Sequence, residues 1–137
     1  MAILLDPSVV VAAADVADLN HAAAVAWFGR VEEPLLLPAG ALVELDHVLQ
    51  RELGPAASLA VVGSVLAGGI GLVAPTEADL ARAAELLREA AEHRPRLGDA
   101  LLVAAAERLG IWRIATFDRR PLAVFRPRHV RAFDFEP

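Results

Sequence analysis

The most constraining feature of the chain is a short apolar run, Ile3-Leu4-Leu5, that ends abruptly in a carboxylate at Asp6. A run of this kind is typical of a strand that is buried on both faces, as in a parallel sheet. In open α/β sheets, ligands bind just beyond the carboxyl ends of the strands. Because Asp is depleted at buried positions, Asp6 is hard to explain as packing material, and we expect it to belong to a ligand site.

Short apolar runs alternate with helical patterns along the rest of the chain. Strands are expected at residues 3–5, 34–38, 70–74 and 111–116, with a fifth at 129–133. Helices are expected at residues 8–14, 22–31, 39–53, 55–67, 78–93 and 100–109, and around 119–124. This alternation predicts an α/β fold with a parallel sheet and right-handed crossovers.

The composition of the 137-residue chain, which is long enough for one domain, excludes several classes of chemistry. The absence of Cys excludes disulfides, thiolate catalysis and Cys-ligated zinc, and the absence of Lys excludes Schiff-base chemistry and a P-loop. The net charge of −5 gives no bulk attraction for nucleic acid, so a polyanion must be bound locally or through metal ions. A cytoplasmic location is the expectation for a chain without Cys and without a visible N-terminal signal.

One uncharged stretch, residues 56–76, is long enough to cross a bilayer. Four glycines interrupt it, at Gly63, Gly68, Gly69 and Gly71. We therefore expect a helix, a turn near Gly68-Gly69 and a buried strand, and no association with a membrane.

Three further carboxylates stand at unusual places. Asp118 follows the strand at 111–116, Glu44 interrupts an apolar helix surface, and Asp99 begins a helix rich in Ala, Val and Leu. Taken singly, Glu44 could reach solvent, Asp99 could cap its helix and Asp118 could begin a turn. If the first and last main strands are neighbours, however, Asp6 and Asp118 face one crevice. Four carboxylates in one pocket would repel each other and raise their pKa values, a conflict that Mg²⁺ or Mn²⁺ resolves.

In these residues the chain resembles the PIN-domain nucleases, and among them the VapC-like toxins of bacterial toxin–antitoxin pairs. The family's apolar strand followed by Asp-x-Ser is matched by Ile3-Leu4-Leu5-Asp6-Pro7-Ser8, and its Thr-x-Asp motif by Thr116-Phe117-Asp118. Glu44 and Asp99 match its acidic helix position and the Asp at the start of a core helix. The resemblance implies a single PIN domain over residues 1–137, with three layers and a central parallel sheet of four to five strands.

The same resemblance implies what the site does. Asp6, Glu44, Asp99 and Asp118 would bind Mg²⁺, or Mn²⁺, and carry catalysis, while Ser8 and Thr116 would orient the carboxylates or a metal-bound water. The implied activity is Mg²⁺-dependent endoribonuclease cleavage of RNA by metal-assisted attack of water, with inhibition by a cognate antitoxin. A homodimer is also implied. Two departures from the family pattern are Pro7, where many relatives carry Thr, and Arg119-Arg120, where some relatives add an acid.

A basic C-terminal region suggests where RNA is contacted. Six arginines and a single acid lie between residues 113 and 131. Arg119 and Arg120, together with Arg96 before the Asp99 helix, are expected to contact phosphates, and Arg94 could flank the same mouth. Each arginine alone could equally form an intramolecular ion pair. The antitoxin groove and the dimer surface are expected among the helices between residues 20 and 66.

Other functions remain open from the sequence. One is a PIN-type nuclease of RNA maturation without a toxin role, and another is a catalytically inactive PIN module that makes protein contacts. A phosphatase with an Asp-x-Asp nucleophile is disfavoured, because Ser8 replaces the second Asp and the chain has no Lys.

Overall fold

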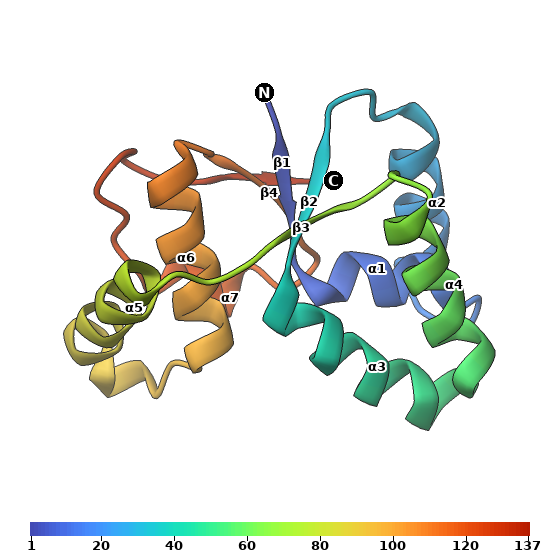
Figure 1. The fold of residues 1–137 in the computed structure, drawn as a ribbon, viewed down its shortest axis with the longest axis horizontal. Helices are drawn as coiled ribbons and strands as arrows, with labels where there is room; N and C mark the ends of the chain where they lie inside the picture. Colours follow the sequence, from blue (N-terminus) through green and yellow to red (C-terminus); the bar gives the residue numbers. More distant parts are fainter.

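The computed structural model describes all residues from Met1 to Pro137 and contains a five-stranded sheet in the order β3-β2-β1-β4-β5 (Figure 1). The strands are β1 (Ile3–Leu5), β2 (Leu35–Pro38), β3 (Gly71–Val73), β4 (Arg113–Ala115) and β5 (Asp134–Glu136). The helices are α1 (Pro7–Ala14), α2 (His21–Arg30), α3 (Ala39–Leu53), α4 (Pro55–Leu66), α5 (Glu77–Glu89), α6 (Leu97–Leu109) and α7 (Arg120–Ala123), with a 3₁₀ turn at Ala91–His93. Every strand pair is parallel, as predicted.

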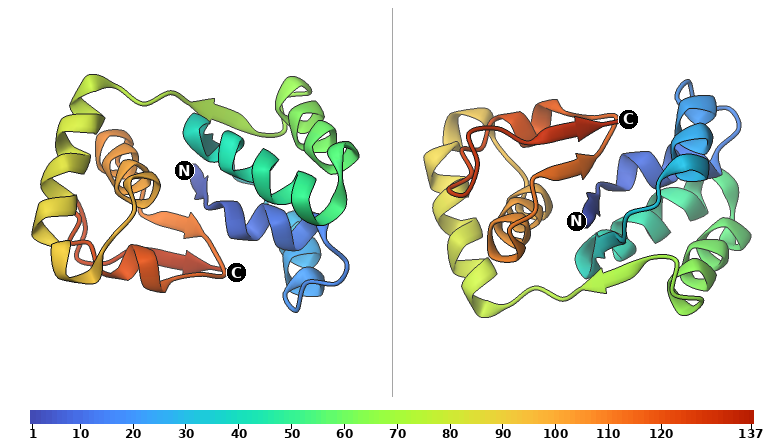
Figure 2. Two further views of the ribbon diagram at one scale, coloured as in Figure 1. Left: turned by 90° about the horizontal axis from the view of Figure 1, so that it is seen from below. Right: turned by 90° about the horizontal axis from the view of Figure 1, so that it is seen from above.

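Helices cover both faces of this sheet, which gives three layers. Side chains alternate along β1, so that Ile3 and Leu5 pack with α1, α2, α3 and α4, whereas Leu4 packs with α5, α6 and α7. The two groups of helices lie on opposite sides of the sheet in Figures 1 and 2. The three-layer α/β fold predicted from the sequence is therefore confirmed.

The centre of the sheet is β1, which lies between β2 and β4. Leu5 is in register with Ala115, and the backbone N–H of Asp6 donates to the carbonyl oxygen of Ala115 at 3.0 Å. The first and last main strands are therefore neighbours, as a crevice shared by Asp6 and Asp118 requires. Their carboxyl ends bring Asp6 next to Thr116.

Two strands of the sheet pass into helices without an intervening loop. Asp6 is the N-cap of α1, and Pro7 occupies the first helical position, where its fixed φ and missing N–H cost nothing. Pro38 likewise ends β2 and precedes Ala39, the first residue of α3. Side chains in the first turns of α1 and α3 are thus held rigidly at the carboxyl edge of the sheet.

The fifth strand was predicted at residues 129–133, and this prediction is wrong, because β5 begins five residues later, at Asp134. The imidazole Nε2 of His129 lies 2.6 Å from the carbonyl oxygen of Ile111, and its ring packs edge-on against Phe133. These contacts hold residues 129–133 as an irregular segment. The ladder starts only where the N–H of Asp134 donates to the carbonyl oxygen of Trp112.

Other predicted bounds differ by smaller amounts. The helix predicted at 78–93 ends at Glu89 and is followed by the 3₁₀ turn, after which Arg94 adopts a left-handed conformation with φ of 50°. The uncharged stretch 56–76 folds as most of α4, a turn and β3. None of the helices has the length and apolarity needed to cross a membrane.

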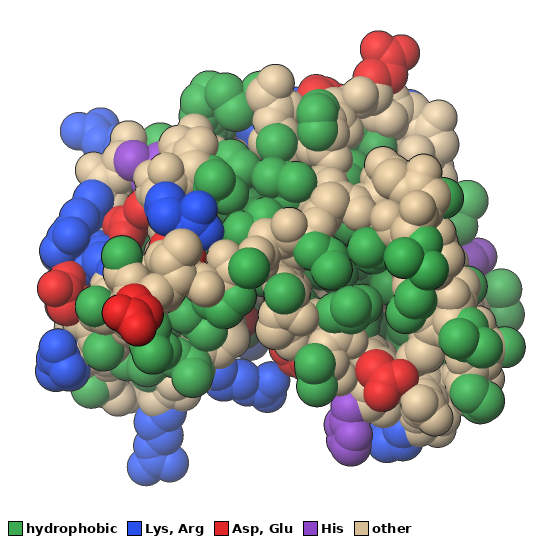
Figure 3. Space-filling view, viewed as in Figure 1, with side chains coloured by type: hydrophobic (Ala, Val, Ile, Leu, Met, Phe, Trp, Pro, Cys, Tyr) green, Lys and Arg blue, Asp and Glu red, His purple; other side chains and the backbone are tan.

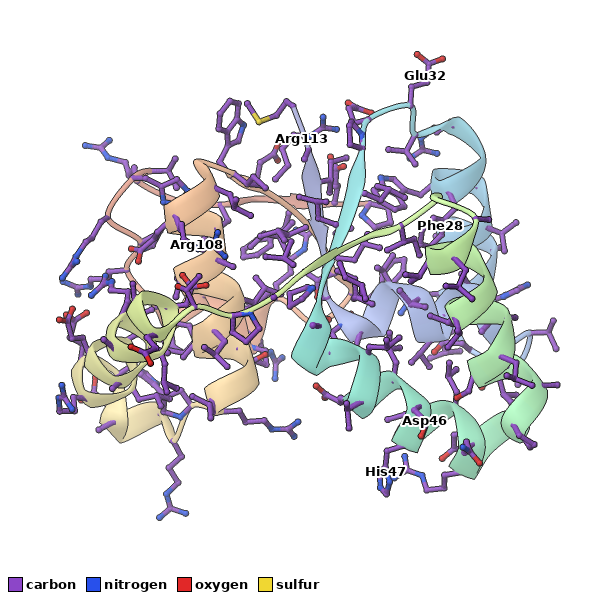
Figure 4. All side chains as sticks on the ribbon, viewed as in Figure 1. Phe28, Glu32, Asp46, His47, Arg108 and Arg113 are labelled. Atoms are coloured by element: carbon purple, nitrogen blue, oxygen red, sulfur yellow. The ribbon has the colours of Figure 1, made fainter.

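An ion pair between a buried carboxylate and a partly exposed arginine ties α5 to α6. Asp79, only 3% exposed, shares a capping box with Thr76 and accepts hydrogen bonds from Nε and Nη2 of Arg108 at 2.9 Å. The guanidinium of Arg108 holds the pKa of Asp79 below its ordinary value of 3.8. In Figure 4, Arg108 lies on α6 beside the segment that leads into α5.

We expect Asp79→Ala to lower the free energy of unfolding by about 2–3 kcal/mol at pH 7, because it removes both the cap and the partner of Arg108. Thr76→Ala, which removes only a cap, should cost about 1 kcal/mol. Since the pKa of Asp79 is lowered by folding, its contribution is present at neutral pH and is lost as the pH falls below 3.8. Urea denaturation at pH 7 and pH 3 measures both effects, and equal losses in the two variants would contradict the ion-pair contribution.

Candidate active site

The carboxylate of Asp6 is held through one of its two oxygens. Oδ2 accepts hydrogen bonds from the backbone N–H of Ser8 at 3.1 Å, from Ser8 Oγ at 2.5 Å and from Thr116 Oγ1 at 3.0 Å. Oδ1 accepts none of these bonds. Among the fully buried side-chain nitrogen and oxygen atoms, only His129 Nδ1 lacks a hydrogen-bond partner. Asp6 Oδ1 is therefore not fully buried and keeps some contact with solvent. Asp6 therefore presents a fixed carboxylate with one free oxygen.

The two hydroxyl groups that hold Asp6 are themselves fixed by backbone donors. Ser8 Oγ accepts the N–H of Phe117 at 3.0 Å, and Thr116 Oγ1 accepts the N–H of Asp118 at 2.9 Å. Each hydroxyl thus accepts one backbone hydrogen bond and donates its own proton to the carboxylate. The network joins the end of β1 to the end of β4. The hydroxyl groups of Ser8 and Thr116 therefore lie in contact with the Asp6 carboxylate and fix its orientation.

All four acids singled out in the sequence line one cavity of about 680 Å³. Asp6 follows β1, Glu44 lies on α3, Asp99 is the third residue of α6, and Asp118 lies in the loop after β4. Asp6 is buried, Asp99 is half-buried, and Glu44 and Asp118 are exposed at the mouth. We call this space the acidic cavity. No three Asp, Glu or His side chains are grouped so as to hold one metal ion as they stand.

Burial and charge repulsion act together on one of these acids. The pKa of Asp99 is raised to about 6, first by burial and then by the negative charges of Asp6 and Glu44. Asp118 raises it further, while Arg96 acts in the opposite direction. The donor set consists of hard carboxylate oxygens that repel each other, which is the chemistry that Mg²⁺ or Mn²⁺ stabilises. The residues present therefore fit a divalent cation.

Arginines form part of the rim of the acidic cavity. Arg94, Arg96 and Arg120 line it, and Nη1 of Arg96 lies 3.8 Å from Oε1 of Glu44. Arg119 does not line the cavity, since its Nη2 lies 3.4 Å from the carbonyl oxygen of the C-terminal Pro137. The neighbours Arg119 and Arg120 therefore point to different places.

Other arginines of the basic C-terminal region are used inside the fold. Arg113 pairs with Glu33 and with Glu136, and Nη2 of Arg128 lies 2.7 Å from Oε2 of Glu85. For these two residues the structure shows the intramolecular ion pairs that the sequence had left as an alternative.

Some residues of the acidic cavity were not foreseen from the sequence. Asp18, Asn20 and His93 also line it. Asp18 and Asn20 lie in the connection between α1 and α2. Asn20 is the N-cap residue of α2, but its side chain makes no capping hydrogen bond. The only sequence feature that could have indicated them is the group of polar residues between the two apolar helices α1 and α2.

Asp46 and His47 lie near Glu44 in sequence but outside the cavity. Both are labelled on α3 in Figure 4, where they lie far from the junction of the two helical layers. Asp46 Oδ1 accepts hydrogen bonds from Gln50 at 2.9 Å and from Ser58 at 2.7 Å. Asp46 therefore helps to join α3 to α4, and it makes a useful control for Glu44.

The raised pKa of Asp99 predicts that Asp99→Asn stabilises the metal-free protein at pH 7 by about 1 kcal/mol. The rise of this pKa from 3.8 to about 6 would correspond to about 3 kcal/mol of unfolding free energy if the group were fully buried. We expect a smaller effect, because solvent screens the half-exposed carboxylate. Because folding raises this pKa, the charged form costs stability above pH 6, and the cost disappears below pH 4.

Urea denaturation in EDTA at pH 7.5 and pH 4 measures this difference. Asp134→Asn is the matched control, since Asp134 is exposed on β5 and does not line the cavity. A gain in stability for Asp99→Asn that is the same at both pH values would contradict the electrostatic origin.

Comparisons with known proteins identify the family to which this fold belongs. Residues 3–126 match the PIN domain family. Over 124 residues, which are 90% of this chain and 92% of the relative, the chain is 28% identical to Ribonuclease VapC26 of Mycobacterium tuberculosis. The match with this ribonuclease therefore extends over almost the whole length of both chains.

Solved structures show the same fold. The chain superposes on Mycobacterium tuberculosis VapC20, described as a sarcin-ricin loop cleaving toxin, with a TM-score of 0.82 and 24% identity over 94% of this chain and 98% of that one. For VapBC2 of Rickettsia felis, solved bound to a DNA fragment from its promoter, the TM-score is 0.71 at 12% identity, with 100% of both chains covered. For FitAcB of Neisseria gonorrhoeae, the TM-score is 0.66 at 21% identity, with 95% of this chain and 100% of that chain covered. Because the family match covers residues 3–126, this chain belongs to the PIN-domain family, and its homologues include VapC-type toxins.

Proposed function

We propose that the chain is a Mg²⁺-dependent endoribonuclease of the VapC type. The observation that carries this proposal is the convergence of Asp6, Glu44, Asp99 and Asp118 on one cavity whose rim is lined by arginines. Membership of the PIN-domain family and 28% identity to a ribonuclease support the same activity. The RNA target of this chain is left open.

The four carboxylates would hold the metal ion. When bound, Mg²⁺ or Mn²⁺ supplies a Lewis acid that polarises a phosphoryl oxygen and lowers the pKa of an attacking water. Asp6 would offer its free Oδ1, because Oδ2 is already occupied by Ser8 and Thr116. Fixing one oxygen leaves the other in a single position and reduces the reorganisation needed on binding.

Arg94, Arg96 and Arg120 would bind RNA phosphates at the cavity rim. A chain with a net charge of −5 must attract a polyanion locally, and these side chains are the basic residues that line the cavity besides His93. Guanidinium groups suit the geometry of phosphate oxygens. Arg119 lies outside the cavity lining, and its contact with phosphate stays a prediction.

An apolar groove of about 820 Å³ supports regulation by an antitoxin. It is lined by residues of α1, α2, α4 and β2, among them Val10, Phe28, Val31, Ala60 and Val61. Figure 4 labels Phe28 at its position between α2 and α4. We propose that an apolar segment of a cognate antitoxin occupies this groove, which combines part of the region expected between residues 20 and 66 with residues of α1 and residues 68–71.

A homodimer completes the proposal. Large apolar side chains such as Val43, Leu72 and Leu80 are 72%, 44% and 53% exposed. Figure 3 shows that apolar atoms gather on the face that carries β3 and the α3–α4 pair. A second copy of the chain would remove such atoms from water.

The proposed chemistry predicts that Asp6→Asn and Glu44→Gln each reduce Mg²⁺-dependent RNA cleavage by about 100-fold or more, because each removes a charge at the reacting centre. Asp46→Asn, which changes a carboxylate on the same helix outside the cavity, should keep wild-type activity. Cleavage of end-labelled RNA with Mg²⁺ and with EDTA provides the measurement. Full activity in Asp6→Asn would rule out the assigned site.

A separate prediction concerns Thr116, which positions Asp6 without entering the reaction. Thr116→Val keeps the shape but removes the hydroxyl that donates to Asp6, and it should weaken Mn²⁺ binding by about 10–100-fold. Thr116→Ser keeps the hydroxyl and should restore binding. Calorimetric titration with Mn²⁺ measures both variants, and equal weakening in the two would show that the hydroxyl is not responsible.

A further inference from the structure

A second cavity lies against the acidic cavity, and we call it the side pocket. Asp6, Glu44 and Asp99 line both cavities, whereas Asp118 lines the acidic cavity but not the side pocket. The remaining walls of the side pocket come mainly from the first turn of α3, from α6 and from the residues around the end of β3, and they include Asp79 of α5, whose carboxylate is paired with Arg108. The three shared acids therefore stand at the junction of two cavities, and a phosphate held there has space on both sides.

The two cavities differ in chemistry. Three arginines line the acidic cavity, and none lines the side pocket. The side pocket is instead bordered by apolar side chains that include Pro38, Ala41, Leu97 and Leu101. Leu97 is 48% exposed although it begins a helix that is otherwise largely buried. Apolar walls suit the face of a nucleobase and give a phosphate nothing to bind.

The size of the side pocket limits what can enter. Its volume of about 230 Å³ is a third of that of the acidic cavity and lies below the roughly 300–1,000 Å³ of a typical ligand site. Small residues create this space, since α3 begins with Ala39-Gly40-Ala41. A Cβ atom at Gly40 would meet no atom within 4 Å, and one at Gly98 would meet only Oε2 of Glu44, at 4.0 Å. A side chain added at Gly40, which lines the side pocket, would therefore start from a Cβ atom in open space.

From this juxtaposition we propose that the side pocket binds the nucleoside on one side of the scissile phosphate and so sets which bases are accepted. The inference rests on the proposed function, because it places RNA across the shared acids. The remaining phosphates follow the arginine rim of the acidic cavity. The pocket has room for one base, so selection acts through the size and shape of a single nucleoside.

The first test fills the side pocket with Gly40→Leu. The matched control is Gly63→Leu, a substitution at an exposed glycine of α4, where a Cβ also meets no atom within 4 Å. After the cleaved bond has been mapped by RNA-end analysis, kcat/KM is measured on the intact oligonucleotide and on two versions in which one flanking base is replaced by hydrogen.

We expect the wild type and Gly63→Leu to lose about tenfold in kcat/KM when the base on one particular side is removed. Gly40→Leu should lose a similar factor on intact RNA and show no further loss on that abasic RNA. The proposal would be overturned if Gly40→Leu lowered kcat/KM relative to the wild type by the same factor on the intact and on the abasic RNA. It would also be overturned if removal of either base left kcat/KM of the wild type unchanged.

A second test needs neither metal nor cleavage. The metal-free protein in EDTA is titrated with adenosine and with cytidine, and the amide signals of Gly40, Leu97 and Gly98 are followed by NMR. We expect saturable shifts in the wild type and none in Gly40→Leu, whereas the absence of saturable shifts in the wild type would overturn the side-pocket assignment. Failure of the wild type to cleave any RNA with Mg²⁺ would instead reject the proposed function, and the nucleoside titration would still decide the pocket.

Discussion

The pairing of β1 with β4 is the constraint on which the rest of the site depends. It brings Asp6 and Thr116, 110 positions apart in the sequence, within a single hydrogen bond. Because both strands end at the same edge of a parallel sheet, the residues that follow them share one crevice. A change in the register of this pair by one residue would turn the side chain of Asp6 toward the opposite face of the sheet, against apolar core side chains.

The site itself works against stability, since it gathers like charges in a partly buried space. The raised pKa of Asp99 shows that burial and neighbouring acids oppose its ionisation. The surrounding fold offsets this cost with two apolar cores and with ion pairs such as Asp79–Arg108 and Arg82–Glu107, none of whose residues lines the acidic cavity. Strain of this kind is typical of functional sites, where rigid neighbours keep repelling groups in place.

Local sequence signals predicted the parts of the fold that local physics determines. The bounds of α3, Ala39–Leu53, followed from regular leucine spacing and from Gly54, which follows its last residue with φ of 87°. The three-residue strand β5 could not be placed in this way, because it exists only through pairing with β4. The four acids were found because carboxylates are out of place in apolar surroundings. Asp18 and Asn20 were missed as cavity residues, since the path of a loop decides what they line.

The acids come from both helical layers as well as from the sheet between them. Glu44 belongs to α3 on one side, Asp99 belongs to α6 on the other, and Asp6 follows the central strand. Their spacing therefore depends on how α3 and α6 are held relative to β1. A partner bound in the apolar groove contacts α1, α2, α4 and β2 but not α6. It can alter this spacing only by displacing α1, which follows Asp6, or α3 against a packed sheet, whereas a segment that continues from the groove into the acidic cavity needs no such displacement. Direct occupation of the cavity is therefore the less costly route by which a partner would close the proposed active site.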